Sequence, residues 1–257
     1  MFEIDMSQVH PTIKTVLALG VEGSGKTHFA STFPKPILMY SFDGGYQTLA
    51  GMEGIRGKVF IDKDRRKPSA HKDFLVEFNK LVDGRETAYT WPDGRQEPYQ
   101  TVVLDPISFL SQYMMYEIQY NNRTTDKKPN WDEYDQVLKM STDVLLKVLE
   151  IAEGRKMCVL ATCHIKIDKD EDTGQMWFLA DMLGSVKEKI GSWFDAVFYL
   201  KVDKKQDGSK IYQLHTAGDR RERGRLRLPP NLDRLVKPID DPNYGVLMQR
   251  LNQEEKK

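Results

Sequence analysis

Cysteine is scarce in this chain of 257 residues: only Cys158 and Cys163 occur, in and beside one apolar segment. Two cysteines exclude a framework of several disulfides and a zinc site made of four cysteines. The pair is consistent with reduced thiols buried in a strand. A partial metal site that includes His164 is the alternative.

A net charge is also absent, since 38 basic residues balance 38 acidic ones. No field of one sign surrounds the whole molecule, so the overall charge does not favour nucleic acid as a partner. Any nucleic-acid site must therefore depend on local clusters of basic residues.

Long hydrophobic runs are missing as well, because no apolar stretch approaches the roughly 20 residues that cross a bilayer. The first residues, Met-Phe-Glu-Ile-Asp-Met-Ser-Gln, have neither the basic region nor the long apolar segment of a signal peptide. We therefore expect a cytoplasmic protein with no membrane partner. The length and the hydrophobic content of 40% suffice for one large α/β domain.

The sequence does contain a glycine-rich phosphate-binding loop, G-x-x-x-x-G-K-[ST], over residues 20–27. It follows an apolar segment of strand character, 15–19, and precedes a segment that can form a helix, 26–32. In such a loop the backbone N–H groups surround phosphates, the lysine reaches the β- and γ-phosphates, and the hydroxyl binds Mg²⁺. The pattern predicts a nucleoside triphosphate site made by Gly20, Val21, Glu22, Gly23, Ser24, Gly25, Lys26, Thr27 and His28, with Thr27 as a metal ligand.

Predicted strands and helices alternate along most of the chain. Strands without polar interruption, separated by helices, indicate a mainly parallel sheet flanked by helices on both faces. We expect strands at 15–19, 37–42, 58–61, 101–105 and 157–162, and helices at 26–32, 71–82, 107–120, 131–153 and 182–194.

Two hairpins interrupt this alternation. Segments 196–202 and 210–216 predict an antiparallel hairpin at one edge of the sheet. Residues 84–100 predict a hairpin insertion, because Pro92-Asp-Gly-Arg95 is a strong turn signal. The expected organisation is an ATPase-type core over 1–230 and a C-terminal tail over 231–257.

Polar residues end the strands that follow the loop, where ligands of parallel sheets bind. Asp105 is predicted to hold Mg²⁺ through water, or to cap the helix that begins at Pro106. Asp43 could polarise the attacking water, or only stabilise the Asp-Gly-Gly turn. His164 could donate a hydrogen bond to the γ-phosphate, or lie exposed at a strand end. Glu22 and Asp62 are weaker substitutes for Asp43.

Two loops combine aromatic and basic residues, which single-stranded DNA requires. One is 121–131, with Arg123, Lys127, Lys128 and Trp131. The other is 165–180, a charged loop with Trp177 and Phe178, whose several acidic residues weaken the prediction.

Residues 201–227 hold nine basic and four acidic residues. Arg220 and Arg221 could reach the nucleotide of a neighbouring subunit. Binding of a phosphate backbone and a solvated surface are the alternatives.

The order of these parts resembles the RecA/RadA core, and three phrases most resemble the compact phage RecA-like ATPases: residues 40–45 (YSFDGG), 161–166 (ATCHIK) and 194–199 (FDAVFY). The resemblance covers roughly residues 13–230. It implies a RecA-like P-loop NTPase fold, ATP and Mg²⁺ as cofactors, and single-stranded DNA as a partner in recombination, annealing or replication in the host cytoplasm. It also implies a homo-oligomer and a single-strand DNA-binding protein as a further partner.

By the same resemblance, Asp43 takes the place of the family's catalytic glutamate, His164 that of the γ-phosphate sensor and Arg220 that of an inter-subunit cation. Lys26 and Asp105 complete the catalytic set. Asp43 is shorter than glutamate, which implies slow hydrolysis.

Other P-loop functions compete with this interpretation. A small-molecule or nucleotide kinase needs an arginine-bearing lid, and residues 121–130 contain only Arg123. A GTPase needs N-K-x-D, which Asn79-Lys-Leu-Val-Asp83 misses by one position. Packaging and defence ATPases remain open, and ATP rather than GTP is implied only by the resemblance.

Overall fold

The computed structural model describes residues 13–169, 176–205, 207–216, 225–226 and 238–253. Its sheet strands are β1 (Thr15–Gly20), β2 (Ile37–Ser41), β3 (Ile55–Val59), β6 (Thr101–Asp105), β7 (Cys158–Lys169), β8 (Met176–Ala180), β9 (Ala196–Lys204), β10 (Lys210–His215), β11 (Arg225–Leu226) and β12 (Ile239–Asp240). The α-helices are α1 (Lys26–Ser31), α2 (Ala70–Val82), α3 (Ile107–Asn121), α4 (Trp131–Gly154), α5 (Val186–Lys189) and α6 (Tyr244–Gln253). Two short 3₁₀ helices are η2 (Gly45–Leu49) and η3 (Ile190–Trp193).

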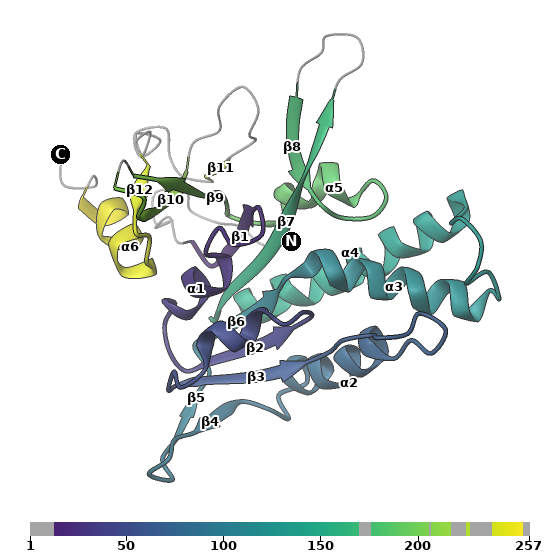
Figure 1. The fold of residues 1–257 in the computed structure, drawn as a ribbon. Coiled ribbons are helices and arrows are strands. Elements are labelled where there is room, and N and C mark those ends of the chain that lie inside the picture. Colours follow the sequence, from purple (N-terminus) through teal and green to yellow (C-terminus); the bar gives the residue numbers. More distant parts are fainter. Residues whose placement is uncertain (1–12, 170–175, 206, 217–224, 227–237, 254–257) are drawn as a thin grey trace, which may run out of the picture.

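The strands form one large sheet in the order β12-β10-β9-β1-β7-β6-β2-β3 (Figure 1), with β8 paired to β7 and β11 to β9. The six strands from β9 to β3 are parallel. At one edge β10 pairs antiparallel with β9, and β12 pairs antiparallel with β10. The predicted α/β fold, a mainly parallel sheet with an antiparallel hairpin at one edge, is confirmed.

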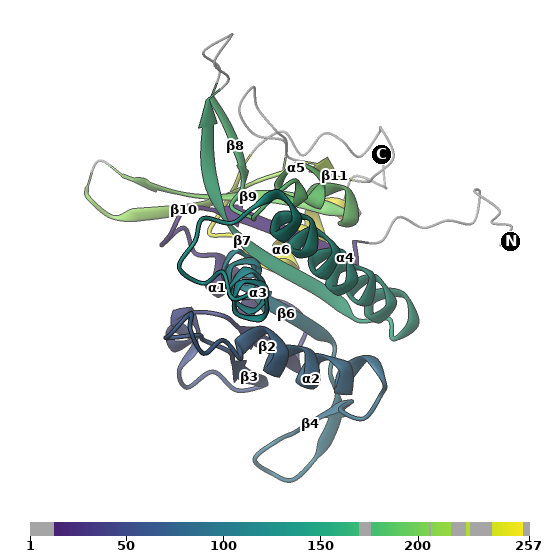
Figure 2. The ribbon, with the colours of Figure 1, turned by 90° about the vertical axis from the view of Figure 1, so that its right-hand side faces the viewer.

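Both faces of the sheet are buried, as the unbroken apolar strands predict. Side chains alternate along each strand, so Leu17 and Leu19 join the core under α2, α3 and α4, while Val16 and Ala18 join the core under α1 and α6. Helices α3 and α4 pack side by side (Figures 1 and 2). This two-sided burial holds the carboxyl ends of the strands in place.

The prediction of a charged loop over 165–180 is wrong in its described part. There β7 continues to Lys169 and pairs antiparallel with β8, forming a ribbon that projects from the sheet (Figure 1). The ribbon lies outside the sheet interior, and Ile167 is largely exposed to solvent. Its strands therefore do not need a continuous apolar run. A charged sequence is compatible with such a ribbon, because the hydrogen bonds between its strands join backbone groups and do not require buried side chains.

Two smaller differences concern element boundaries. Strand β3 begins at Ile55, three residues before the predicted start, because an edge strand with exposed Arg56 and Gly57 carries no apolar pattern. The helix expected over 182–194 is reduced to α5 and η3. The hairpin insertion is present as β4 (Ala88–Thr90) and β5 (Gln96–Pro98).

The described part of 231–257 contributes to the same sheet and core. Ile239 of β12 pairs with Leu214 of β10, and Leu247 of α6 is buried in the core beneath α1. The backbone N–H of Tyr244 donates to the hydroxyl of Thr32 at 3.0 Å. These contacts fix residues 241–243 beside the helix that follows the phosphate loop.

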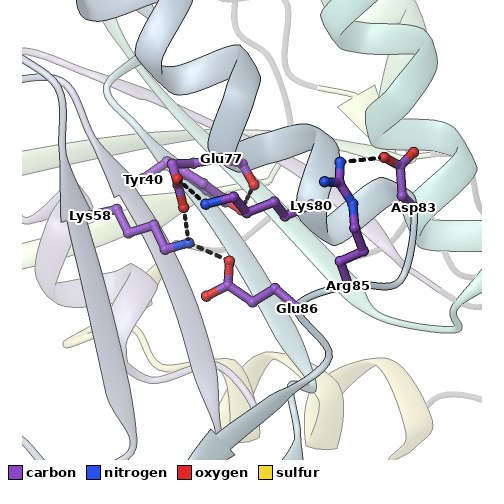
Figure 3. A network of polar contacts seen from close by, with 7 residues as sticks. All are labelled: Tyr40, Lys58, Glu77, Lys80, Asp83, Arg85 and Glu86. Carbon is purple, nitrogen blue, oxygen red and sulfur yellow. Dashed lines mark hydrogen bonds and ion pairs between the residues drawn. The ribbon is translucent and has the colours of Figure 1, made fainter.

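An ionic cluster joins β3, α2 and the segment before β4 (Figure 3). The ammonium of Lys58 contacts Glu77 of α2 at 2.7 Å and also pairs with Glu86. Lys80 pairs with Glu77 from the next helical turn. The cluster therefore anchors the edge strand and the hairpin insertion to the body of the domain.

Candidate nucleotide-binding site

A cavity of about 1250 Å³ lies at the carboxyl ends of the central parallel strands. Parallel pairing puts Gly20 opposite His164 and Ser41 opposite Asp105, so the ends of four strands converge at the position where open α/β sheets bind ligands. The predicted site residues that line the cavity are Glu22, Gly23, Gly25, Lys26, Thr27, His28, Asp43, Asp105 and His164. Gly20, Val21 and Ser24 complete the loop, while Arg220 and Arg221 lie outside the described residues.

Glycine is required in the phosphate loop at two positions, for different reasons. Gly25 precedes α1 with a φ of 88°, a left-handed conformation that side chains disfavour. Gly20 is limited by space, because a Cβ there would lie 2.6 Å from the carbonyl oxygen of Leu200. The loop can therefore turn closely over β1 and β9 only with these glycines.

Lys26 begins α1, and its side chain turns back across the loop. Its buried ammonium donates to the carbonyl oxygens of Gly20 at 2.9 Å and Val21 at 2.8 Å. An ammonium has three donors, so one remains for a ligand in the cavity. Burial lowers the pKa of Lys26, and the nearby carboxylate of Asp105 opposes this shift.

Asp105 is buried and accepts hydrogen bonds from two threonine hydroxyls. Oγ1 of Thr27 donates to Oδ2 at 2.8 Å, and Thr162 of β7 donates to Oδ1. Burial raises the pKa of Asp105, while the hydrogen bonds from Thr162 and Thr27 oppose that rise. The alternative that Asp105 caps α3 is wrong, because Pro106 is the N-cap and no side chain bonds there.

The Thr27–Asp105 pair fits a divalent cation in its chemistry. A hydroxyl and a carboxylate are the oxygen ligands that Mg²⁺ prefers. The buried hydroxyl of Ser24 has no hydrogen-bond partner among the described residues, which leaves one more polar group at the loop for a ligand.

Asp43 stabilises the turn after β2 and also lines the cavity. Its Oδ1 accepts from the backbone N–H of Gly45 at 2.7 Å, which stabilises the turn after β2. A Cβ at Gly45 would lie 2.9 Å from that oxygen and 3.3 Å from Oγ1 of Thr27. The carboxylate therefore holds a turn and lies close to Thr27 at the edge of the cavity.

His164 is half-buried at the point where β7 leaves the sheet. Its backbone N–H donates to the hydroxyl of Ser108 at 2.8 Å, and its ring meets Phe109 edge to face at 5.9 Å. Burial, and then the charge of Lys26, lower the pKa of His164. This shift favours the neutral form of the imidazole.

Within the described ranges, the two cysteines and His164 do not gather into a metal-ligating group. Cys163 is buried beside Ser108, and burial raises its pKa to about 12. Cys158 lies 3.6 Å from the hydroxyl of Tyr244. In the described part of the chain, no group of three or more metal-ligating side chains occurs.

A further wall of the cavity lies outside the predicted site residues. That wall consists of Leu200, Lys210, Tyr212, Asp241, Pro242 and Asn243. Lys210 and Tyr212 follow the turn of the edge hairpin. That turn is the one sequence feature that could have pointed to them as cavity residues. The last three residues come from the segment assigned to the tail.

The parallel sheet, the glycine loop and the buried Lys26 and Asp105 define a P-loop NTPase domain. Residues 13–225 match a family model described as an AAA domain, and the chain belongs to this family. It is therefore an ATP-binding domain of the P-loop ATPase type. A search of curated proteins finds no match to the chain. Within the residues described, no helix is long and apolar enough to cross a membrane.

Proposed function

We propose that this protein is a Mg²⁺-dependent ATPase that acts on single-stranded DNA, in recombination, strand annealing or replication. The observation that carries the DNA part is Trp131, which is 87% exposed at the first position of α4. An exposed indole beside basic side chains supplies the stacking and the charge that single strands bind.

The phosphate end of ATP would be held by the loop and by Lys26. Thr27 would bind Mg²⁺ through its hydroxyl, and Asp105 would hold the ion through water. When bound, the ion neutralises charge on the β- and γ-phosphates. The preformed Thr27–Asp105 hydrogen bond supports this assignment because it already brings the two oxygen ligands together.

Hydrolysis would use Asp43 and His164. The carboxylate of Asp43 would orient and deprotonate the attacking water. The neutral imidazole of His164 would donate one hydrogen bond to the γ-phosphate. We expect a slow reaction, because Asp43 is shorter than glutamate and its carboxylate also holds the turn after β2.

The loop before α4 is ordered by its own hydrogen bonds. Asn130 and Glu133 form a capping box at the start of α4, and Gln119 donates to the carbonyl oxygen of Lys127 at 3.1 Å. Trp131 is thus presented on a fixed helix end. The loop that leads to it carries three exposed basic side chains, Arg123, Lys127 and Lys128.

A neighbouring loop adds further positive charge. Arg65 and Arg66 lie 3.4 and 3.3 Å from Asp126, so the segment between β3 and α2 touches the loop before α4. Both arginines remain exposed. The ribbon of β7 and β8 supports DNA contact less well, because Phe178 packs against the core. Among the ribbon residues whose burial the structure describes, Lys166 and Ile167 are the exposed ones.

The test is ATP hydrolysis measured with and without single-stranded DNA, together with DNA retention at low and high salt. We expect DNA to stimulate the wild type, Lys26→Ala to abolish hydrolysis, and Trp131→Ala to weaken DNA binding about tenfold. Leu146→Ala removes another exposed apolar side chain of α4 and is the matched control. Hydrolysis that ignores DNA, with no retention at low salt, would contradict the proposal and leave a kinase, packaging or defence ATPase.

The RecA-like part of the proposal concerns assembly. By the resemblance, Arg220 of one subunit would contact the nucleotide bound by the next, and a single-strand DNA-binding protein would be a partner. Mixing Arg220→Ala and Lys26→Ala proteins tests the first point, because each mutant spoils a different half of a shared site. If no activity returns in the mixture, Arg220 does not act between subunits.

A further inference from the structure

The cavity is larger than a triphosphate requires. Its volume of about 1250 Å³ exceeds the roughly 300–1,000 Å³ of typical ligand pockets. Beyond the phosphate loop it continues to the wall formed by β10 and by the turn between β12 and α6. The functions assigned so far give no role to this wall.

Tyr212 places an aromatic ring at the end of the phosphate loop. The side chains of Lys210, Tyr212 and Leu214 share one face of β10, since residues alternate along a strand. Leu214 is buried in the core with Phe29 of α1, while Lys210 and Tyr212 line the cavity. Ring atom Cδ1 of Tyr212 lies 3.1 Å from the position of a Cβ on Gly25.

The turn at 241–243 is bonded to the backbone of Tyr212. The backbone N–H of Asp241 donates to the carbonyl oxygen of Tyr212 at 2.7 Å. Asp241 has a φ of 46°, in the left-handed region that is uncommon outside glycine but that aspartate adopts more readily than most residues. Pro242, between Asp241 and Asn243, is buried against the cavity.

Asn243 has one end of its amide committed and the other end open. Its Oδ1 accepts from the backbone N–H of Val246 at 2.9 Å and so caps α6. An amide carries two donors on its nitrogen, and this nitrogen belongs to a residue that lines the cavity. The wall therefore offers a ring, an apolar proline, an amide donor and the carboxylate of Asp241.

We propose that this wall is the nucleobase subsite, a step that rests on the nucleotide-binding function proposed above. The ring of Tyr212 and Pro242 contact the faces and rim of the base. Asn243 donates to a ring nitrogen, and Asp241 accepts from the exocyclic amino group. Adenine presents an amino donor beside a ring-nitrogen acceptor, which matches this pair. The C-terminal segment thus selects the nucleotide, whereas the loop holds its phosphates.

The experiment compares binding of ATP with binding of inorganic tripolyphosphate, by titration calorimetry with Mg²⁺. The wild type should bind ATP at least tenfold more tightly than tripolyphosphate, because base–aromatic stacking alone contributes about that much. Tyr212→Leu should lower ATP affinity about tenfold and leave tripolyphosphate affinity within about twofold. Asn243→Ser keeps an oxygen to cap α6 and should also weaken only ATP.

Gln213→Ala is the matched control, because its side chain lies on the opposite face of β10 and contacts Asp240. It should change neither affinity. Equal wild-type affinity for ATP and tripolyphosphate would overturn the subsite and leave the phosphate site intact. It would also be overturned if Tyr212→Leu and Asn243→Ser lowered the affinity for ATP and for tripolyphosphate by the same factor. A wild type that binds neither ligand would overturn the nucleotide site as a whole.

Discussion

The hydroxyl of Thr27 donates a hydrogen bond of 2.8 Å to Oδ2 of Asp105, across 78 positions of sequence. Thr27 lies on α1, which follows β1, and Asp105 ends β6. These two strands are not neighbours, because β7 lies between them. Thr27 reaches across that strand from the start of α1, and Thr162 of β7 supplies the second hydrogen bond to the same carboxylate. Three elements are thus joined at one buried carboxyl group.

The first prediction concerns the Thr27 hydroxyl. Thr27→Ala should lower ATP affinity about tenfold or more with Mg²⁺ present, because it removes a ligand of the ion. Thr27→Ser keeps the hydroxyl and should behave like the wild type. ATP titrations in Mg²⁺ and in EDTA measure this difference. An equal loss in EDTA would assign the effect to the loop itself and contradict a role at the metal.

Thr162 should matter for stability. Thr162→Val keeps the shape of the side chain but removes a donor to the buried carboxylate of Asp105. We expect the free energy of unfolding in urea to fall by about 1–3 kcal/mol at pH 7, the cost of a buried acceptor that loses its partner. Thr162→Ser retains the donor and should lose less. An unchanged urea midpoint in Thr162→Val would contradict this account.

His164 should affect hydrolysis more than binding. His164→Leu removes the hydrogen-bond donor and should reduce the hydrolysis rate on the order of 10²-fold, with ATP affinity within about threefold. Because burial and Lys26 lower the pKa of His164, the imidazole stays neutral above its usual titration range. The wild-type rate should therefore show no histidine titration between pH 7 and 8. A step in that range, absent from His164→Leu, would reveal a charged imidazole instead.

Glu77 should make stability depend on acid. Hydrogen bonds from Lys58 and Lys80 lower the pKa of Glu77 from 4.5 to about 2. A carboxylate with a depressed folded-state pKa stabilises the fold fully above the unfolded-state value and loses this contribution as pH falls towards the folded-state value. Glu77→Gln should therefore be destabilised at pH 6, and its difference from the wild type should shrink between pH 4.5 and 2.

Urea unfolding at several pH values measures the Glu77 effect. The exposed Glu150 of α4 provides the control, because Glu150→Gln removes a carboxylate outside the ionic cluster. A gap between wild type and Glu77→Gln that stays constant down to pH 2 would show that the cluster does not depend on the charge of Glu77.

The sequence predicts most of the fold because buried strands and glycine loops follow local rules. Residues 101–105 form a strand with every residue buried, and its three central residues, Val102, Val103 and Leu104, give a recognisable apolar run. The ribbon of β7 and β8 escapes prediction, because its strands are stabilised by backbone pairing and are partly exposed to solvent. The β3 boundary is missed for the same reason, since an exposed edge carries no pattern.

The sequence predicts those cavity residues that directly follow an apolar strand as single polar residues. Asp43, Asp105 and His164 all reach the cavity because parallel strands bring their carboxyl ends together. Thr162 as a partner of Asp105, and Tyr212 and Asn243 in the far wall, depend on pairings between distant segments. No local pattern contains the 2.7 Å contact between Asp241 and Tyr212, so only the folded chain reveals this wall.

The close approach of Gly20 to Leu200 constrains which sequences this fold accepts. A methyl group at position 20 would meet a backbone oxygen at 2.6 Å, and backbone cannot rotate away as a side chain can. At Gly44, in contrast, φ is −81° and an added Cβ meets no atom within 4 Å. In a library randomised at both positions, active members should retain glycine at 20 and accept many residues at 44. Two glycines that look alike in the sequence are therefore very unequal as targets for substitution.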